Sequence, residues 1–184
     1  MSRQEALIII DVQQGMFGFP GIGPVTKTDL LKNIDRLAKS ARKADCHVIY
    51  VQHEGNADHP LYKEKPGYEF PPEIRPEPGD QIVTKKQCGM FTETKLEQVL
   101  QDLNIERLIV CGMQTEFCVD TGVRTAADRG YEIIIAKEAH ATFDTPNLSA
   151  KQIAEHHETL WAQAFGSVQS IKDIQFVGAE CAPA

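Results

Sequence analysis

Several features that mark common classes of protein are scarce in this sequence. No apolar run approaches the roughly 20 residues of a membrane-spanning helix, and the N-terminal residues lack the long apolar segment and cleavage site of a signal peptide. Positive charge is also scarce, because 19 lysine and arginine residues face 26 aspartate and glutamate residues, for a net charge of −7. Such a chain has no general affinity for nucleic acid or anionic lipid. We therefore expect a cytoplasmic protein with no nucleic-acid partner and no membrane partner.

Paired cysteines and a dinucleotide-binding fingerprint are also absent from the sequence. The cysteines are Cys46, Cys88, Cys111, Cys118 and Cys181. Their number is odd and none lies in a CxxC pair, which favours free thiols over disulfides or a zinc site. The glycines between positions 11 and 23 do not form GxGxxG, which argues against a dinucleotide site. We expect no cofactor.

The remaining sequence has the pattern of one α/β domain. Its 184 residues suffice for one well-buried core. Short apolar runs predict strands at 6–10, 47–51, 81–84, 107–111 and 131–136, with a short sixth near 166–168. Helical periodicity covers 30–41, 96–103, 119–127 and 148–165. This alternation predicts a single domain over residues 1–184, with a six-stranded, mostly parallel, Rossmann-like sheet covered by helices on both faces.

One segment, residues 55–79, interrupts this alternation. It has no clear periodicity and carries six of the ten prolines. A loop of this length inside a compact domain is uncommon and often serves as a lid or a binding loop. A surface excursion stiffened by proline is an equally good interpretation at this stage.

Ionisable side chains follow the predicted strands. Asp11 follows the first strand, His53 and Glu54 the second, and Lys85 the third, while the fourth leads toward Cys118. Ligands of open parallel sheets bind at the carboxyl ends of the strands, near the point where strand order reverses. An acid, a base and a thiol are therefore expected at one edge of the sheet.

Cys118 stands at the start of the third predicted helix. A thiol in the first turn of a helix meets unpaired N–H groups and the positive end of the dipole, which predicts a lowered pKa. Those N–H groups are also suited to holding an oxyanion. Singly, each residue has a plainer interpretation: Cys118 as a small buried hydrophobe, Asp11 as a brace for the following turn, and Lys85 with Lys86 as a solvated basic patch.

Four segments resemble the isochorismatase-like cysteine hydrolase family. They are LIIIDVQ at 7–13, KKQCGMF at 85–91, CGMQTEFCV at 111–119 and AADRGY at 126–131. The resemblance extends over about residues 6–165, almost the whole chain. The catalytic lysine of the family stands six residues before a phenylalanine, so Lys85, rather than Lys86, is the match for Phe91.

The resemblance implies a catalytic triad of Asp11, Lys85 and Cys118. It also implies a cis peptide between Met113 and Gln114, which aims the Gln114 N–H at the substrate. In the implied mechanism, Asp11 takes the proton of Cys118 and the thiolate attacks a carbonyl carbon. The oxyanion rests on the N–H groups of Gln114 and Cys118, and water then hydrolyses the thioester. The family commonly forms dimers or tetramers, so a homo-oligomer is expected.

Two departures from the family's patterns narrow the substrate. Nicotinamidase-like members carry an Asp-x-His metal motif where this chain has Gln52-His53-Glu54, so we expect no metal. Members that hydrolyse the vinyl ether of isochorismate often lack the cysteine, so Cys118 favours an amide, ureido or carbamoyl substrate. The residues expected to bind this small molecule are Phe17, His53, Glu54, Phe117 and Phe143. The alternatives are an isochorismatase-type hydrolase of another small substrate and a non-catalytic binding protein on the same fold.

Three other patterns in the sequence have a possible functional meaning. Cys118 and Arg124 satisfy the Cys-x5-Arg spacing of cysteine-dependent phosphatases, but the intervening residues have helical periodicity and Asp120 would repel a phosphate. His140 follows the fifth strand and is a candidate for the same edge of the sheet. The remaining candidates are outside the site: His156 and His157 as a solvated or capping pair, and Trp161 as a core or subunit-interface residue.

Overall fold

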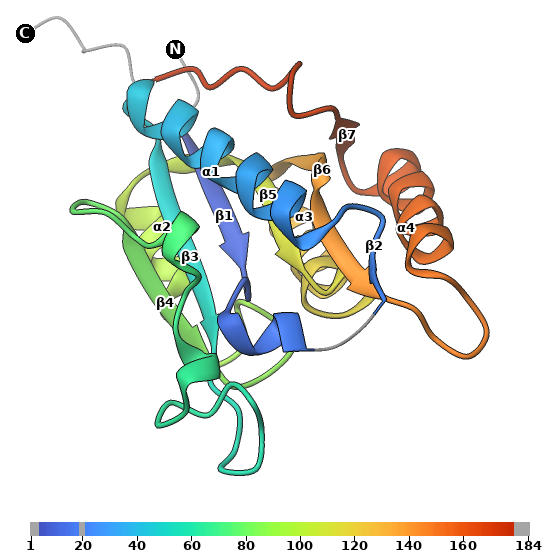
Figure 1. Cartoon of the computed structure of the whole chain (residues 1–184). Helices are drawn as coiled ribbons and strands as arrows, with labels where there is room; N and C mark the ends of the chain where they lie inside the picture. The colour runs from blue at the N-terminus through green and yellow to red at the C-terminus, as the bar shows by residue number, and fades with distance from the viewer. Residues whose placement is uncertain (1–3, 19–20, 179–184) are drawn as a thin grey trace, which may run out of the picture.

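A twisted sheet runs through the computed structural model of the chain, which describes residues 4–18 and 21–178 (Figure 1). Its strands are β1 (Gln4–Ile10), β2 (Ile22–Gly23), β3 (His47–His53), β4 (Gln81–Lys85), β5 (Ile105–Met113), β6 (Glu132–Phe143) and β7 (Ser167–Gln169). The order across the sheet is β2-β6-β5-β1-β3-β4, and β7 also pairs with β6. All pairs are parallel except β2 with β6. The predicted fold class, an α/β domain with a mostly parallel sheet, is confirmed.

The predicted number of strands is wrong, because the described residues form seven strands rather than six. The additional strand, β2, has two residues and pairs antiparallel with the end of β6, where Ile22 lies opposite Phe143. Two residues cannot show the alternation by which a strand is recognised in a sequence. The second half of β6, which pairs with β5 up to Ala141, was also not predicted. The continuous apolar run that indicated this strand ends at Ala136.

Helices cover both faces of the sheet (Figure 1). They are α1 (Lys27–Lys43), α2 (Leu96–Asp102), α3 (Asp120–Asp128) and α4 (Ala150–Ala164). The buried side of α1 packs on one face with Leu7 and Ile9 of β1. Side chains of α2, α3 and α4 pack on the other face with Ala6, Ile8 and Ile10. β1 is thus buried on both sides, as expected of a continuous apolar run. None of the helices among the described residues is long and apolar enough to cross a membrane.

Strand order reverses at β1. On one side of β1 lie β3 and β4, and on the other lie β5 and β6. Since parallel strands end at the same edge, the residues that follow β1, β3 and β5 meet at this reversal, which is where such sheets bind ligands. The candidate residues of the sequence lie at this edge.

The proline-rich segment, residues 55–79, is built into the domain. It contains two short 3-10 helices, η2 (Pro66–Tyr68) and η3 (Pro72–Ile74). Leu61 and Phe70 are buried in the core cluster beneath α1. The carbonyl of Tyr68 accepts hydrogen bonds from the side-chain amides of Gln13, at 2.9 Å, and Gln52, at 3.0 Å. The segment is therefore anchored to the ends of β1 and β3, while most of its side chains are exposed or partly exposed. It is a surface segment held against the sheet, which is compatible with both interpretations of the sequence.

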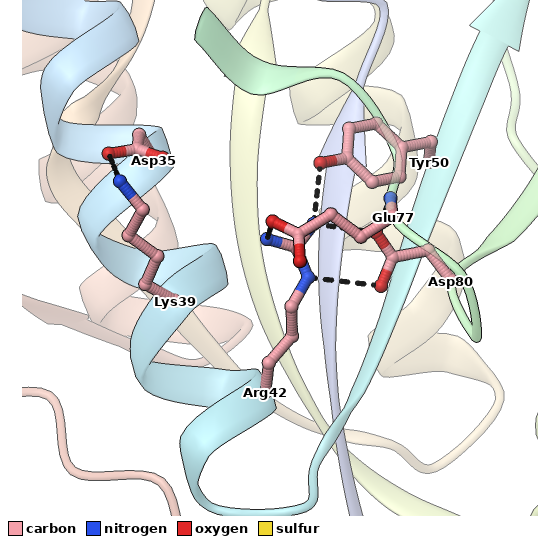
Figure 2. Close-up of polar contacts among 6 residues, drawn as sticks. All are labelled: Asp35, Lys39, Arg42, Tyr50, Glu77 and Asp80. Carbon is pink, nitrogen blue, oxygen red and sulfur yellow. Dashed lines mark hydrogen bonds and ion pairs between the residues drawn. The ribbon is translucent and has the colours of Figure 1, made fainter.

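Arg42, near the end of α1, fastens the last part of this segment to the sheet (Figure 2). Its guanidinium donates to Asp80 at 3.2 and 2.6 Å, to Glu77 at 2.7 Å and to the hydroxyl of Tyr50 at 3.2 Å. The Asp80 side chain is only 5% exposed. A planar donor with several fixed N–H groups is suited to holding two carboxylates and a phenol at once. This cluster joins α1, β3 and the entry to β4.

We predict that Arg42→Met lowers the free energy of unfolding by about 2 kcal/mol, because it leaves the buried carboxylate of Asp80 without its cationic partner. Lys39→Met is the matched control on the same helix. The ion pair of Lys39 with Asp35 is exposed (Figure 2), so its loss is expected to cost less than about 0.5 kcal/mol. Urea unfolding of both variants measures the difference. Equal losses would contradict the role assigned to the Arg42 cluster.

Candidate active site

Asp11 follows the last residue of β1 and is almost fully buried, at 3% exposure. Its backbone is in the left-handed region, with φ of 51°, which aspartate tolerates better than most residues. The Asp11 N–H still continues the sheet by donating to the carbonyl of Val51 at 2.9 Å. The chain then turns into a short 3-10 helix, η1 (Gln14–Gly18). This turn holds the carboxylate at the carboxyl edge of the sheet.

Lys85 is the last residue of β4 and its side chain is fully buried. Its Nζ atom lies 2.7 Å from Oδ2 of Asp11, 3.2 Å from Sγ of Cys118, 3.0 Å from the carbonyl of Gln87 and 3.3 Å from Nδ1 of His53. Lys86 is exposed. The alternation of side chains along a strand explains why two adjacent lysines differ in this way. Lys85 therefore brings the acid and the thiol together.

Cys118 lies on a single π-helical turn, η4 (Thr115–Val119), that runs directly into α3. The carbonyl of Gln114 accepts hydrogen bonds from the N–H groups of Phe117 and Val119, both at 3.2 Å. Such turns are rare and are frequently found at functional sites. The sequence predicted a helix that starts at Val119, but the helical turn already begins at Thr115. Cys118 lies within its first turn, half-buried, with Sγ facing the Lys85 ammonium.

The prediction of a lowered pKa for Cys118 is wrong. Burial and the nearby Asp11 carboxylate raise the pKa of this thiol, and the opposing effect of Lys85 does not compensate. Burial also raises the pKa of Asp11, against the effects of Lys85 and Cys118. Burial lowers the pKa of Lys85, but Asp11 and Cys118 outweigh it, so that the pKa is raised. Cys118 does lie in the first turn of a helix, as predicted. Desolvation of the thiol nevertheless has a larger effect on its pKa than the helix start. The raised pKa values favour the neutral thiol of Cys118 and the charged ammonium of Lys85.

His53, the last residue of β3, is neutral in this environment. Burial, the Lys85 ammonium and His59 together lower the pKa of His53 to about 4. An ammonium only donates hydrogen bonds, so Nδ1 of His53, 3.3 Å from Nζ of Lys85, is the acceptor. The proton of the neutral ring is therefore on Nε2. His53 presents a fixed donor beside the catalytic candidates.

A cavity of about 290 Å³ opens above Cys118. It is lined by Asp11, Met16, His53, His59, Leu61, Cys88, Met113, Gln114, Phe117 and Cys118. The predicted residues His53 and Phe117 are among them. Four others, Met16, His59, Leu61 and Cys88, were not identified from the sequence. His59 and Leu61 come from the proline-rich segment, whose missing periodicity indicated a binding loop without indicating which of its residues reach the site.

The other predicted substrate-binding residues lie beside or outside this cavity. Glu54 lines an adjoining cavity of about 530 Å³ that shares His53 and His59. Phe143 lines another of about 250 Å³ that shares Gln114. Phe17 lines none of these three cavities: it packs against the core cluster beneath α1, with Nζ of Lys27 4.8 Å from its ring centre. Its assignment as a substrate-binding residue is not supported by this placement.

The peptide bond between Met113 and Gln114 is cis, as the resemblance implies. The preceding residue, Gly112, has φ of 129°. A Cβ atom at Gly112 would lie 2.1 Å from the carbonyl oxygen of Ile10, so a side chain there would push β5 away from β1. Glycine is therefore required where the segment that carries Cys118 leaves the sheet next to Asp11.

A buried polar network supports the turn that carries Cys118. His140 is fully buried, and its Nδ1 lies 3.0 Å from Oγ1 of Thr115 while its Nε2 lies 3.3 Å from Oε1 of Glu158. The indole N–H of Trp161 donates to Asp120 at 2.8 Å. His140 is thus behind the site and does not line it. Trp161 is a core residue, in agreement with one of its two predicted roles.

The phosphatase spacing and the paired histidines of the sequence both lie on helices. Arg124 donates to both carboxylate oxygens of Asp120, at 2.9 Å, along α3. Residues 115–128 are helical, so they do not form the loop of N–H groups that a cysteine-dependent phosphatase wraps around phosphate. His157 contacts the carbonyl of Ile153 at 2.9 Å through Nδ1. No cluster of three or more potential metal ligands occurs among residues 4–18 and 21–178.

The Asp11 carboxylate and the Cys118 thiol line one cavity at the edge of a parallel sheet, and the buried Lys85 ammonium contacts both. These groups are suited to nucleophilic catalysis. The family model of the isochorismatase domain matches residues 5–173. The chain is 29% identical to a secreted isochorismatase effector of Verticillium dahliae, over 94% of this chain and 92% of that protein. It is 32% identical to a streptothricin hydrolase of Streptomyces noursei over 77% of this chain, and the match spans 56% of that relative. The crystal structure of a cysteine hydrolase from Pseudomonas syringae has a TM-score of 0.84 and 27% identity, covering 92% of this chain and 90% of that one. The chain belongs to the isochorismatase family of hydrolases.

The lowered pKa of His53 predicts a pH dependence of stability. Above pH 6.5 the ring is neutral in the folded and the unfolded chain, whereas between pH 6.5 and about 4 only the unfolded chain binds the proton. Stability due to this group is therefore lost as the pH falls through that window. We expect His53→Gln to flatten the decline of Tm between pH 6.5 and 4, measured by thermal unfolding. His156→Gln, on the exposed side of α4, is the control. Parallel declines in both variants and wild type would show that His53 is not a neutral, desolvated ring.

Proposed function

We propose that this protein hydrolyses the C–N bond of a small amide, ureido or carbamoyl compound through a thioester at Cys118. The observation that carries the proposal is the position of the Lys85 ammonium, 2.7 Å from the Asp11 carboxylate and 3.2 Å from the Cys118 sulfur. A buried cation between a base and a thiol stabilises the negative charge on either one. Proton transfer from sulfur to carboxylate thus keeps the charge beside Lys85.

The first half of the reaction forms the thioester. As the substrate enters and displaces water, Asp11 takes the proton of Cys118 and the sulfur attacks the carbonyl carbon. Its raised pKa makes the Asp11 carboxylate a stronger base than an exposed aspartate. The C–N bond then breaks, and Asp11 transfers the proton to the leaving nitrogen. The amine or ammonia departs, which leaves the acyl group on Cys118.

The second half uses the same groups with water as nucleophile. Asp11 takes a proton from water, the hydroxide attacks the thioester, and the C–S bond breaks. Asp11 then returns the proton to the Cys118 sulfur, which restores the resting thiol. In both halves the oxyanion is assigned to the backbone N–H groups of Gln114 and Cys118, next to the cis peptide.

The cavity supports a small substrate with a polar and an apolar end. Its volume of about 290 Å³ is at the lower limit of ligand pockets. Met16 and Leu61 supply an apolar wall, and Nε2 of His53 supplies a hydrogen-bond donor for a carbonyl or carboxylate oxygen of the substrate. A streptothricin hydrolase and a protein described as a cysteine hydrolase are among the similar proteins, in keeping with hydrolysis through a thiol.

The proposal predicts ammonia or amine release together with an acyl-enzyme. Small amides, ureas and carbamoyl compounds are screened for ammonia or amine release. The enzyme is then mixed with any substrate found and quenched with acid, and the mass of the intact protein is measured by mass spectrometry. The adduct is expected on Cys118, and Cys118→Ala is expected to abolish both signals. Cys111→Ala, which removes a buried thiol from β5, is the matched control and should retain them. Release that survives in Cys118→Ala would contradict the thioester route.

A second prediction distinguishes the two adjacent lysines. Lys85→Met keeps the length and apolar stem of the side chain but removes the charge between Asp11 and Cys118. We expect kcat/KM to fall by at least about 10²-fold, as for the loss of a positioned catalytic group. Lys86→Met, at an exposed position, is expected to cost less than about twofold, the range of an exposed surface change. Equal losses at both positions would indicate a general basic patch, and a loss at Lys86 alone would mean that the register is wrong.

A further inference from the structure

A second thiol lies beside Cys118 in the same cavity. Cys88 belongs to the loop between β4 and α2, and its Sγ atom is 3.7 Å from Sγ of Cys118 and 3.4 Å from Oγ1 of Thr121. Cys88 is exposed, whereas Cys118 is half-buried. The hydrolytic mechanism gives Cys88 no task. Two sulfurs in direct contact, one of them open to solvent, have the proximity that disulfide formation needs.

We propose that Cys88 and Cys118 are a reversible oxidation site, in which a hydroperoxide converts the two thiols into a disulfide and thereby blocks the nucleophile. Bonded sulfurs are about 2 Å apart, so the two must approach from their separation of 3.7 Å. Cys88 precedes Gly89 in a loop of turns, where side-chain rotation and a small backbone shift close this gap. The loss of hydrolase activity rests on the proposed function, whereas the bond itself does not.

The chemistry balances with the hydroperoxide as the oxidant. The sulfur of Cys88, which is exposed and meets the peroxide first, attacks one peroxide oxygen and the O–O bond breaks. The thiol proton leaves with the departing alcohol, and Cys88 becomes a sulfenic acid. Cys118 then gives its proton to Asp11 and attacks the Cys88 sulfur, and the displaced hydroxide takes that proton to leave as water. In sum, two thiols are oxidised to one disulfide and one hydroperoxide is reduced to an alcohol and water.

The other described cysteines are poorly placed to compete. Cys46 and Cys111 are buried, and each lies apart from this cavity, Cys46 after α1 and Cys111 within β5. Burial raises the pKa of Cys46 to about 11 and that of Cys111 further, which keeps both as unreactive thiols. Cys181 lies outside the described residues. The geometry therefore selects Cys88 as the partner of Cys118.

Peptide mapping tests the bond without any substrate. The protein is treated with one equivalent of hydrogen peroxide, free thiols are blocked with iodoacetamide, and the unreduced chain is cut after lysine, arginine and glutamate. This digest separates Cys88 on residues 87–93 from Cys118 on residues 117–124. We expect the two peptides to be joined with the loss of two hydrogen atoms, and dithiothreitol to separate them. Hydrolase activity, once a substrate is known, is expected to fall with the fraction joined and to return with dithiothreitol.

Cys88→Ser is the matched variant, and its rate is compared with its own untreated rate. This variant should form no link to residues 117–124. Its hydrolase activity should not fall after peroxide treatment and return with dithiothreitol, as that of the wild type is expected to do. A link from Cys118 to Cys46, Cys111 or Cys181, or no link while Cys118 becomes oxidised alone, would overturn the proposal. Joined peptides in a protein with no hydrolase activity would support the oxidation site and count against the proposed function, so the two can fail separately.

Discussion

The buried ammonium of Lys85 is the constraint on which the rest of the site depends. A fully buried cation is costly unless opposite charge and hydrogen-bond acceptors surround it. Here those partners come from separate parts of the chain: the carboxylate of Asp11 after β1, the sulfur of Cys118 after β5, and the carbonyl of Gln87 after β4. The ammonium can be satisfied only when these strand ends meet. The contacts that stabilise the buried lysine are therefore the same contacts that assemble the site.

The same ammonium influences the protonation of its neighbours. It favours the ionised form of Asp11 against the effect of burial. Burial, and after it the ammonium, keeps His53 neutral with its remaining proton directed away from Lys85. The thiol of Cys118 stays protonated at rest, because burial and Asp11 outweigh the lysine. A protonated thiol reacts more slowly with electrophiles than a thiolate does. The neighbouring Cys88, in contrast, is exposed to solvent in the same cavity.

The proline-rich segment completes the cavity from outside the sheet. It is anchored near its middle by the carbonyl of Tyr68, which accepts hydrogen bonds from two glutamines, and near its end by the ion pairs of Arg42. Between its start and these anchors it places Leu61 and His59 over Cys118. The segment thus holds its shape through the hydrogen bonds of its own turns and through contacts with β1, β3 and α1. Substrate selection is expected to depend on this part of the chain.

The sequence by itself determined the class of fold, the strand ends that carry the candidate residues, and the choice of Lys85 over Lys86, because periodicity and short motifs are local properties of the chain. It also pointed to the family and to the cis peptide before Gln114. The tertiary structure decided what depends on residues distant in the sequence: the two-residue strand β2, the position of Leu61 in the cavity, the packing of Phe17 against the core beneath α1, and the contact of Cys88 with Cys118. It also reversed the expected pKa shift of Cys118, since desolvation depends on every segment packed around the thiol and no local pattern records it.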